Sequence, residues 1–586
     1  MNNQSFRNIK LAGMVTLTTL LASCGYETSV TSDSTPPTTT QAARILTQAT
    51  FGPTIDSINH IQDIGVGAWY NEQFNKPQTM HFDYVNPLVS QMPAGSNIDD
   101  STFQQSFWKQ AITGDDQLRQ RVTFALSQIF VISFQNTNLA SMPRGLAHYY
   151  DMLGSHAFGN FRNLLEDVTK HPMMGIYLSA LRNQKTVGAR VPDENYAREV
   201  MQLFTIGLKK LNQDGSEVTP AAATYTNDDI KGLAKVFTGW SWGGQKSSDI
   251  CTLNNCRRFN ASTTDTNTAF VDPFRDILPM QQYAPFHEIL SKYDDMDSLE
   301  IPKSVLYTEY LAGSPYGRLI PTGTSGEESL KIALDTLFAH PNVGPFIGRQ
   351  LIQRLVTSNP SPGYISRVSA AFNNNGQGVR GDMKAVIKAI FSDIEAIDPS
   401  NTTNNPSPYT YIPDNVGKLR EPVVRLANWM RAFHVTSTTG TFPVGNTDDP
   451  LRSLGQTPLR APSVFNYYRP DYQAAKTTTT AANLVAPELQ ITNELSVFGY
   501  LNYMRNVIPN GIANGTIKAD YAPELALVGT PNLLLDRISL LLLQKNISNE
   551  LRDKILAAIS ATTNPNNKVY LAIFLTMASP EYITQK

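Results

Sequence analysis

Apolar residues recur at helical spacing over most of this chain. From Ala42 onward they return every three or four residues, the interval that places side chains on one face of an α-helix. The pattern predicts helices through the N-terminal third, again over residues 330–391, and in four C-terminal segments, 423–433, 533–543, 550–559 and 569–577. No alternation of apolar and polar residues is long enough for a large sheet. We therefore predict a mainly α fold, a multi-helix body with an irregular, loop-rich insertion.

Changes in composition divide this helical pattern into regions. The chain of 586 residues has room for about three or four domain-sized units. Segments rich in Asp, Asn, Thr and Pro interrupt the helices twice, as is typical of loops and linkers. We predict a signal peptide (1–23), a flexible tether (24–41), an N-terminal helical region (42–242), a loop-rich insertion (243–325), a helical region (326–400), a linker (401–417) and a C-terminal helical region (418–586).

The first two dozen residues have the features of an export signal. Arg7 and Lys10 precede the uncharged run 11–22, which is too short for a spanning helix and ends in Leu-Ala-Ser before Cys24. This ending resembles the lipobox of bacterial lipoproteins, in which the cysteine is acylated and becomes the mature N-terminus. The alternative is an ordinary cleaved signal with an incidental cysteine. We expect an exported protein held in the cell envelope by a lipid on Cys24. Because Gly25 and not aspartate follows, the outer membrane is favoured if the host is Gram-negative.

Charge and cysteine content narrow the possible partners. Lys and Arg number 48 against 50 Asp and Glu, a net charge of -2, so no global field favours nucleic acid. Of three cysteines, Cys251 and Cys256 remain once Cys24 is assigned to the lipid. A disulfide is the plainest use of two nearby thiols in an oxidising compartment. A zinc site is the rival, although two thiolates supply only half of a tetrahedral shell.

The densest polar cluster on a predicted helix lies at residues 193–207. Asn195, Glu199 and Gln202 share one helical face, and Glu194 lies with Arg198 on the next. In a functional interpretation the glutamates act as acid, base or cation ligands oriented by Arg198. In a structural interpretation, which we favour, Arg198 and Glu199 are buried partners that lock helix to helix.

Other candidates are scattered along the chain. His287, beside Glu288, could be a general base or a metal ligand, although a solvated surface histidine is the simpler expectation. Trp240 and Trp242 lie among glycines and could present aromatic faces to a sugar, with buried packing as the alternative. The sequence contains no His-Glu-x-x-His motif, phosphate loop or nucleophile elbow. We therefore assign no metal site, and the sequence identifies no particular cofactor. His148, His156, His171 and Glu199 could converge into a metal site. The simpler expectation for histidines beside helix ends is that they cap the helices.

Several segments resemble the bacterial domain of unknown function 1800 (DUF1800) family. The matching segments are 119–130, 156–161, 171–178, 193–207, 237–240, 340–341, 454–468 and 579–582. One departure is that no Leu-Gly follows closely after Lys292, which weakens His287 as a fixed catalytic element. The family has no established activity to transfer. Its members are often encoded beside a second exported family, domain of unknown function 1501 (DUF1501), which resembles sulfatases, and this implies a possible partner protein.

Two functional hypotheses follow. The first is an envelope lipoprotein that binds or helps to assemble a glycan or protein partner. The alternative is a hydrolase of an envelope or extracellular polymer, with Glu194, Arg198, Glu199 and His287 at its centre. An open cleft lined by the carboxylates would favour the enzyme, and a sealed, mutually paired Arg198 and Glu199 would disfavour it.

Overall fold

The computed structural model describes residues 36–93, 96, 98–244, 275–290, 300–398 and 416–586. Cys24, Cys251 and Cys256 lie outside these residues, so the lipid anchor and the disulfide stay predictions. The signal peptide, most of the tether and most of the 401–417 linker also lie outside them.

Helices dominate the structure and confirm the predicted mainly α fold. They account for 52% of the residues that the structure describes and strands for 5%. The helices are α1 (Thr39–Ala49), α2 (Ile55–Ile64), α3 (Val66–Asn75), α4 (His81–Ser90), α5 (Ser101–Thr113), α6 (Gln117–Ser127), α7 (Pro143–Ser155), α8 (Phe161–Lys170), α9 (Pro172–Tyr177), α10 (Asn195–Gln202), α11 (Asn227–Ala234), η1 (Ala284–Phe286), α13 (Tyr307–Leu311), α14 (Gly326–Ala339), α15 (Val343–Leu355), α16 (Pro362–Asn373), α17 (Met383–Ser392), α18 (Ile394–Ile397), α19 (Pro422–Ala432), α20 (Thr478–Ala481), η3 (Pro487–Ile491), α21 (Glu494–Asn510), α22 (Ala522–Leu525), α23 (Pro531–Leu543), α24 (Asn549–Ser560), α25 (Pro565–Ala578) and α26 (Pro580–Ile583).

Within the described ranges, the strands form four separate two-stranded antiparallel sheets. They pair as β1 (Trp240–Ser241) with β2 (Gln281–Gln282), β3 (Ser304–Val305) with β4 (Arg318–Leu319), β5 (Lys418–Leu419) with β8 (Thr584–Gln585), and β6 (Thr436–Ser437) with β7 (Ile517–Lys518). The pairing of β5 with β8 ties the chain's end to the start of the C-terminal region.

Local sequence signals fix several helix ends. The segment Thr226 to Asp229 forms a capping box, in which the Asp229 carboxylate accepts from the backbone N–H of Thr226 at 2.6 Å. The helix that it opens, α11, ends at Ala234. α14 begins at Gly326, after Ser325 accepts a hydrogen bond from the Glu328 backbone N–H. Gly326 is also the predicted start of the second helical region, 326–400.

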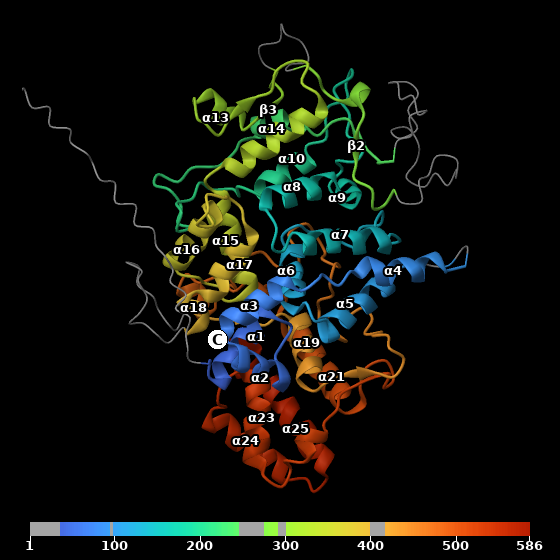
Figure 1. The fold of residues 1–586 in the computed structure, drawn as a ribbon, viewed down its shortest axis with the longest axis vertical. Coiled ribbons are helices and arrows are strands. Elements are labelled where there is room, and N and C mark those ends of the chain that lie inside the picture. Colours follow the sequence, from blue (N-terminus) through green and yellow to red (C-terminus); the bar gives the residue numbers. More distant parts are fainter. Residues whose placement is uncertain (1–35, 94–95, 97, 245–274, 291–299, 399–415) are drawn as a thin grey trace, which may run out of the picture.

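The helices stack along the molecule's long axis (Figure 1). α8, α10 and α14 lie at one end, α3, α5, α6 and α15 in the middle, and α23, α24 and α25 at the other end. Buried apolar side chains form one connected cluster that runs from Ala42 to Tyr582. The regions that composition separates therefore share one core. No helix in the described part of the chain has the length and apolar character needed to cross a membrane.

Candidate functional site

Helix α10 brings the predicted 193–207 motif to the surface on one side only. Tyr196 and Val200 are buried, and the Tyr196 hydroxyl donates to Thr169 at 2.7 Å while its ring meets Phe237 edge-on. The helix ends at Gln202, earlier than the predicted end near Leu208, and the chain then turns at Gly207, which has a positive φ of 69°. The buried face anchors α10, and the opposite face carries polar side chains.

Arg198 and Glu199 are not the buried partners that we expected from the sequence. The Arg198 side chain is 41% exposed, and its Nη2 lies 3.5 Å from Glu194 Oε2. Adjacent helical residues project about 100° apart, whereas residues four apart share a face, so Arg198 pairs with Glu194. The prediction of a sealed Arg198–Glu199 pair is therefore wrong, and that of Glu194 beside Arg198 is confirmed.

Glu199 is buried without an ion pair among the described residues. The residue is 6% exposed, and Oε2 has no hydrogen-bond partner in the part of the chain that the structure describes. Burial raises the pKa of Glu199, and the nearby charge of Arg198 lowers it by less. The carboxyl group thus holds its proton to higher pH than an exposed glutamate.

Half-buried polar groups from three segments surround Glu199. The Tyr225 hydroxyl donates to Gln202 Oε1 at 3.0 Å. Burial raises the pKa of Tyr177 to about 12, with the charge of Glu199 as the second cause, and Glu199 also contributes to the raised pKa of Tyr225. We call Tyr177, Arg198, Glu199, Gln202 and Tyr225 the α10 surface. The predicted residue Asn195 is exposed at the start of the same helix.

Trp240 and Trp242 do not form an open aromatic platform. Each is only 3% exposed. The Lys170 ammonium lies 5.6 Å from the ring centre of Trp240, and the Arg275 guanidinium lies 5.2 Å from that of Trp242. The packing alternative holds for both rings, which corrects their assignment as ligand-binding residues.

His287 is buried, contrary to the expected solvated surface histidine. Its Nδ1 lies 2.9 Å from the Thr238 carbonyl, so Nδ1 carries the proton, and its Nε2 lies 3.4 Å from Ser329 Oγ. Burial lowers the pKa of His287 to about 4. His287 and Ser329 are both completely buried, so this serine–histidine contact has no access to a substrate. The histidine fastens the insertion to α14 and is not part of the α10 surface.

His148 and His171 meet, but as a hydrogen-bonded pair. His171 Nδ1 accepts from the Met173 backbone N–H, so neutral His171 carries its proton on Nε2 and donates to His148 Nδ1 at 3.0 Å. These two nitrogens are therefore already used and do not form a metal-binding pair. His156 lies apart from them, with its Nε2 2.6 Å from Asp167. Within the described ranges, no group of three or more His, Cys, Asp and Glu side chains is placed to hold a metal ion.

A second polar cluster, which the sequence analysis missed, lies in the core. We call it the buried polar centre, and it comprises Arg121, Gln128, Arg354, Lys418, Glu421, Gln456, Tyr468 and Glu488. Lys418 Nζ lies 3.1 Å from Glu488 Oε1 and 3.7 Å from Glu421 Oε1. Gln456 donates to the other oxygen of Glu421 at 2.9 Å. The cluster joins α6 and α15 to the C-terminal region.

Charge pairing controls protonation in this centre. Although burial acts to raise it, the charges of Lys418 and Arg121 hold the pKa of Glu421 below its usual range. Burial raises the pKa of Glu488. An adjoining cavity beside Gln128 and Asn466 measures only about 10 Å³, so it is too small for any ligand larger than a water molecule. The buried polar centre is closed to ligands, and we interpret it as a structural contact between α6, α15 and the C-terminal region.

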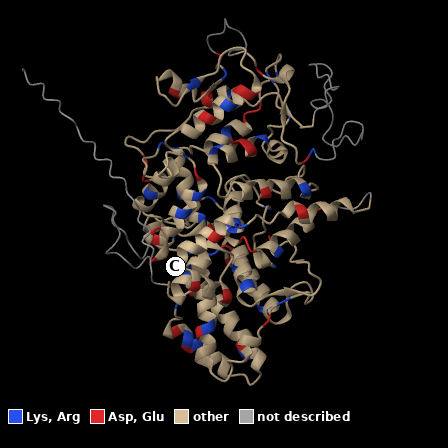
Figure 2. Cartoon of the chain, viewed as in Figure 1, with Lys and Arg blue, Asp and Glu red and all other residues tan. Residues whose placement is uncertain are grey.

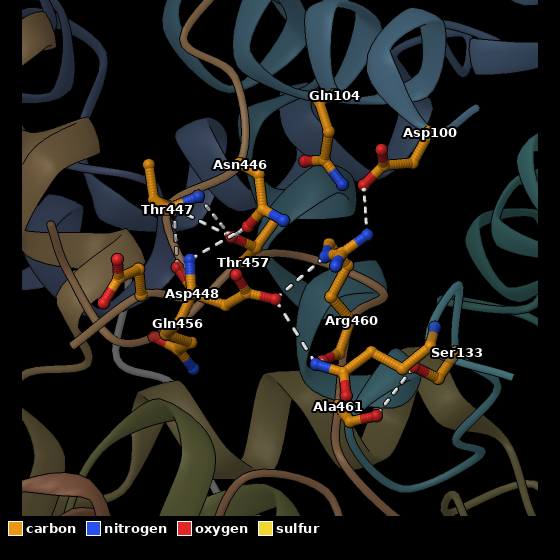
Figure 3. A network of polar contacts seen from close by, with 12 residues as sticks. Asp100, Gln104, Ser133, Asn446, Thr447, Asp448, Gln456, Thr457, Arg460 and Ala461 are labelled. Carbon is orange, nitrogen blue, oxygen red and sulfur yellow. Dashed lines mark hydrogen bonds and ion pairs between the residues drawn. The ribbon is translucent and has the colours of Figure 1, made fainter. Parts of the chain in front are cut away.

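A network on the 446–461 segment positions this centre. Figure 3 shows Arg460 between Asp100 and Asp448, at 3.0 and 2.8 Å. The Ser133 hydroxyl donates to the Ala461 carbonyl at 2.7 Å in the same view (Figure 3). These contacts hold the 446–461 segment against α5, and this places Gln456 within hydrogen-bond distance of Glu421. One feature of the sequence could have indicated the buried polar centre. Arg121 falls on the apolar stripe that contains Leu118, Val122 and Ala125, and a charge on such a stripe is expected to be buried.

Elsewhere, charges of both signs are interspersed over the helices (Figure 2). A surface groove of about 350 Å³ lies between α8 and α14. Alternating charges line it, with Arg162 bonded to Glu166 at 2.8 Å and Lys170 bonded to Glu166 at 2.9 Å. The cations of this groove are already paired, so it joins two helices and offers no excess of one charge.

Comparison with known proteins places the chain in a family. The family model described as protein of unknown function (DUF1800) matches residues 44–584. The chain belongs to the DUF1800 family. The match includes both the α10 surface and the buried polar centre of this DUF1800 member. A comparison with curated proteins and one with solved structures each find no match.

Proposed function

We propose that this DUF1800 protein is an exported, lipid-anchored component of the cell envelope that binds or helps to assemble a glycan or protein partner. The run 11–22, the small residues before Cys24 and the polar tether support export and anchoring. Gly25 favours the outer membrane in a Gram-negative host. A sulfatase-like DUF1501 protein is the partner that the family resemblance suggests.

The single observation that carries the binding role is the composition of the α10 surface. Gln202, Arg198 and two tyrosines combine hydrogen-bonding groups with aromatic rings, and all four are partly exposed. Arg198 and Gln202 lie on a helix whose other face is buried in the core, whereas Tyr177 ends α9 and Tyr225 precedes α11. Such a rigid, partly exposed polar and aromatic surface suits recognition of a ligand.

Membrane fractionation tests the envelope assignment. Replacing Cys24 by Ser removes the acylated atom, so we expect the protein to leave the membrane fraction or to remain unprocessed. The matched control is Cys251→Ser, which makes the same chemical change elsewhere and should leave fractionation unchanged. Unaltered fractionation of Cys24→Ser, with no lipid on the N-terminal peptide of the wild type, would refute the anchor.

A hydrolase is the second candidate, and the unpartnered Glu199 oxygen favours it. A buried carboxyl group with a raised pKa keeps its proton to higher pH than an exposed glutamate does, and a general acid must hold a proton. Glu194 and Arg198 lie on the same helix, whereas His287 lies sealed in a separate contact. If the protein cleaves a polymer, Glu199→Gln should retain binding and lose cleavage, because an amide has no proton to transfer.

A further inference from the structure

We propose that the exposed face of α21 inserts into the surface of a zwitterionic phospholipid bilayer and gives the protein a second membrane contact beside its lipid. The inference rests on the proposed lipid anchor at Cys24 and adds an orientation to it. It starts from three apolar side chains near the start of α21: Leu495 is 53% exposed, Val497 41% and Phe498 65%. Apolar side chains that cluster on a surface in this way mark a contact with another molecule or with a membrane.

The helical geometry of α21 places these three side chains together. Successive residues project about 100° apart, so Phe498 lies near the middle of the exposed face, with Leu495 and Val497 on either side of it. The opposite face is buried and includes Tyr500 and Met504. Further along the exposed face, the residues are polar: Asn502, Arg505 and Asn506. The first half of α21 therefore presents apolar side chains where a helix that faces only water carries polar ones.

A neighbouring segment, 449–453, extends the apolar face. Pro450 lies so close to α21 that a Cβ atom at Gly499 would be 2.2 Å from the Pro450 carbonyl oxygen, so the close approach requires glycine. The next residue of the segment, Leu451, is 61% exposed. Leu495 lies one helical turn before Gly499, on the side of this segment. We call Leu451, Leu495, Val497 and Phe498 the α21 patch.

The charges beside the α21 patch favour a zwitterionic bilayer. On the neighbouring segment, Asp449 lies 3.8 Å from Arg452. On α21, Glu494 and Arg505 are both exposed and have opposite signs. The surroundings of the patch therefore carry no excess positive charge that would call for anionic lipid, and burial of apolar area is the attraction that remains.

The proposed anchor can bring the α21 patch to the bilayer. α1, at the start of the described chain, contacts α23, which contacts α25, which in turn contacts α21. Helices in contact lie about 10 Å apart, so these three steps give about 30 Å between α1 and α21. The 12 residues from Cys24 to Thr35 can span up to about 40 Å. A lipid on Cys24 and the α21 patch can therefore contact the same bilayer.

Contact through the α21 patch would orient the whole protein. α21 packs on α25, and α10 and α13 lie toward the opposite end of the molecule (Figure 1). With α21 on the bilayer, the α10 surface faces away from the membrane. The second contact thus presents the proposed binding surface to a partner in solution.

Quenching by brominated lipid tests this inference. Full-length protein, purified in detergent, is reconstituted into phosphatidylcholine vesicles with or without bromine on the acyl chains, and the vesicles are collected by flotation. Bromine quenches tryptophan fluorescence on contact. Because the chain has five tryptophans, each variant is compared with wild type. We expect the emission that Phe498→Trp adds to lose most of its intensity in brominated vesicles.

Leu311→Trp is the matched control, since Leu311 is 66% exposed on α13, away from α21. The emission that this variant adds should keep its intensity in brominated vesicles. High salt should leave the quenching of Phe498→Trp unchanged, because the contact is apolar. Circular dichroism of both variants checks folding.

The inference is overturned if the emission added by Phe498→Trp is quenched no more than that added by Leu311→Trp, or if high salt abolishes the quenching. Unquenched emission that shifts with protein concentration would likewise reject the membrane and assign the patch to a second copy of the chain. The mass of the N-terminal peptide in the same samples reports the lipid separately. Lipid on Cys24 without quenching rejects the patch alone, and quenching without lipid rejects the anchor alone.

Discussion

The buried polar centre and the α10 surface both contain glutamate and arginine but use them differently. Glu421 lies between Lys418, Gln456 and Arg121, and its pKa is held below the usual range. Glu199 is nearly as well buried, has no ion pair among the described residues, and has a raised pKa. Burial alone therefore does not fix the state of a carboxyl group. Nor is one cation enough, because the pKa of Glu488 is raised by burial although Lys418 lies 3.1 Å away. The balance between burial and the full set of cations and hydrogen-bond donors around a carboxyl group decides whether its pKa rises or falls.

We expect the largest loss of stability when the cation of the buried polar centre is removed. Lys418→Ala removes the cation that faces both Glu421 and Glu488 and leaves buried carboxylates uncompensated. We expect a loss of about 3–5 kcal/mol in the free energy of unfolding, measured by denaturant titration. Lys554→Ala, at a pair of exposed side chains with Glu550, is the control and should cost less than about 1 kcal/mol. A Lys418→Ala protein as stable as this control would contradict the structural role of the centre.

The sequence predicted the helices better than it predicted which side chains interact. Helical spacing and capping signals such as Thr226 and Asp229 are local, and they gave the fold class and several helix ends. Lys418 and Glu488 are joined only by the tertiary fold, and no periodicity reveals that Gln456 reaches Glu421. The centre was therefore missed, although Arg121 on an apolar stripe was a visible sign of a buried charge.

For the candidate site, the predicted helix at 193–207 is confirmed, whereas the predicted Arg198–Glu199 pair is wrong. Helical geometry placed Glu194 beside Arg198, as the structure confirms. The partner of Glu199 could not be read from spacing, because it depends on what α9 and the residues before α11 bring to that face. The burial of His287 and Trp240 likewise depends on how the insertion folds back over α14 and α8.

A second prediction concerns Glu199, where the change in stability should be small and depend on pH. A raised pKa means that the folded state binds the proton more tightly, so this contribution is present at low pH and is lost as pH rises through the folded-state value. The free energy of unfolding of Glu199→Gln should therefore lie within about 1 kcal/mol of the wild-type value. Relative to wild type, this free energy should be higher at pH 8 than at pH 5. Urea titrations at both pH values measure this. A Gln variant that loses relative stability as pH rises would show that the native carboxylate is paired.

The smallest effect is expected at Arg198, where the sequence alone favoured a loss of about 3–5 kcal/mol from a buried pair. The side chains of Arg198 and Glu194 are 41% and 34% exposed, and their charged atoms are 3.5 Å apart. An exposed pair of this kind contributes about 0.3–0.5 kcal/mol, because water and salt screen it. Arg198→Ala should therefore melt almost as the wild type does, while it alters ligand binding at the α10 surface. The double variant with Glu194→Ala gives the pair's coupling energy directly. A coupling of several kcal/mol would place Arg198 with the residues of the buried polar centre and remove the contrast between the two regions.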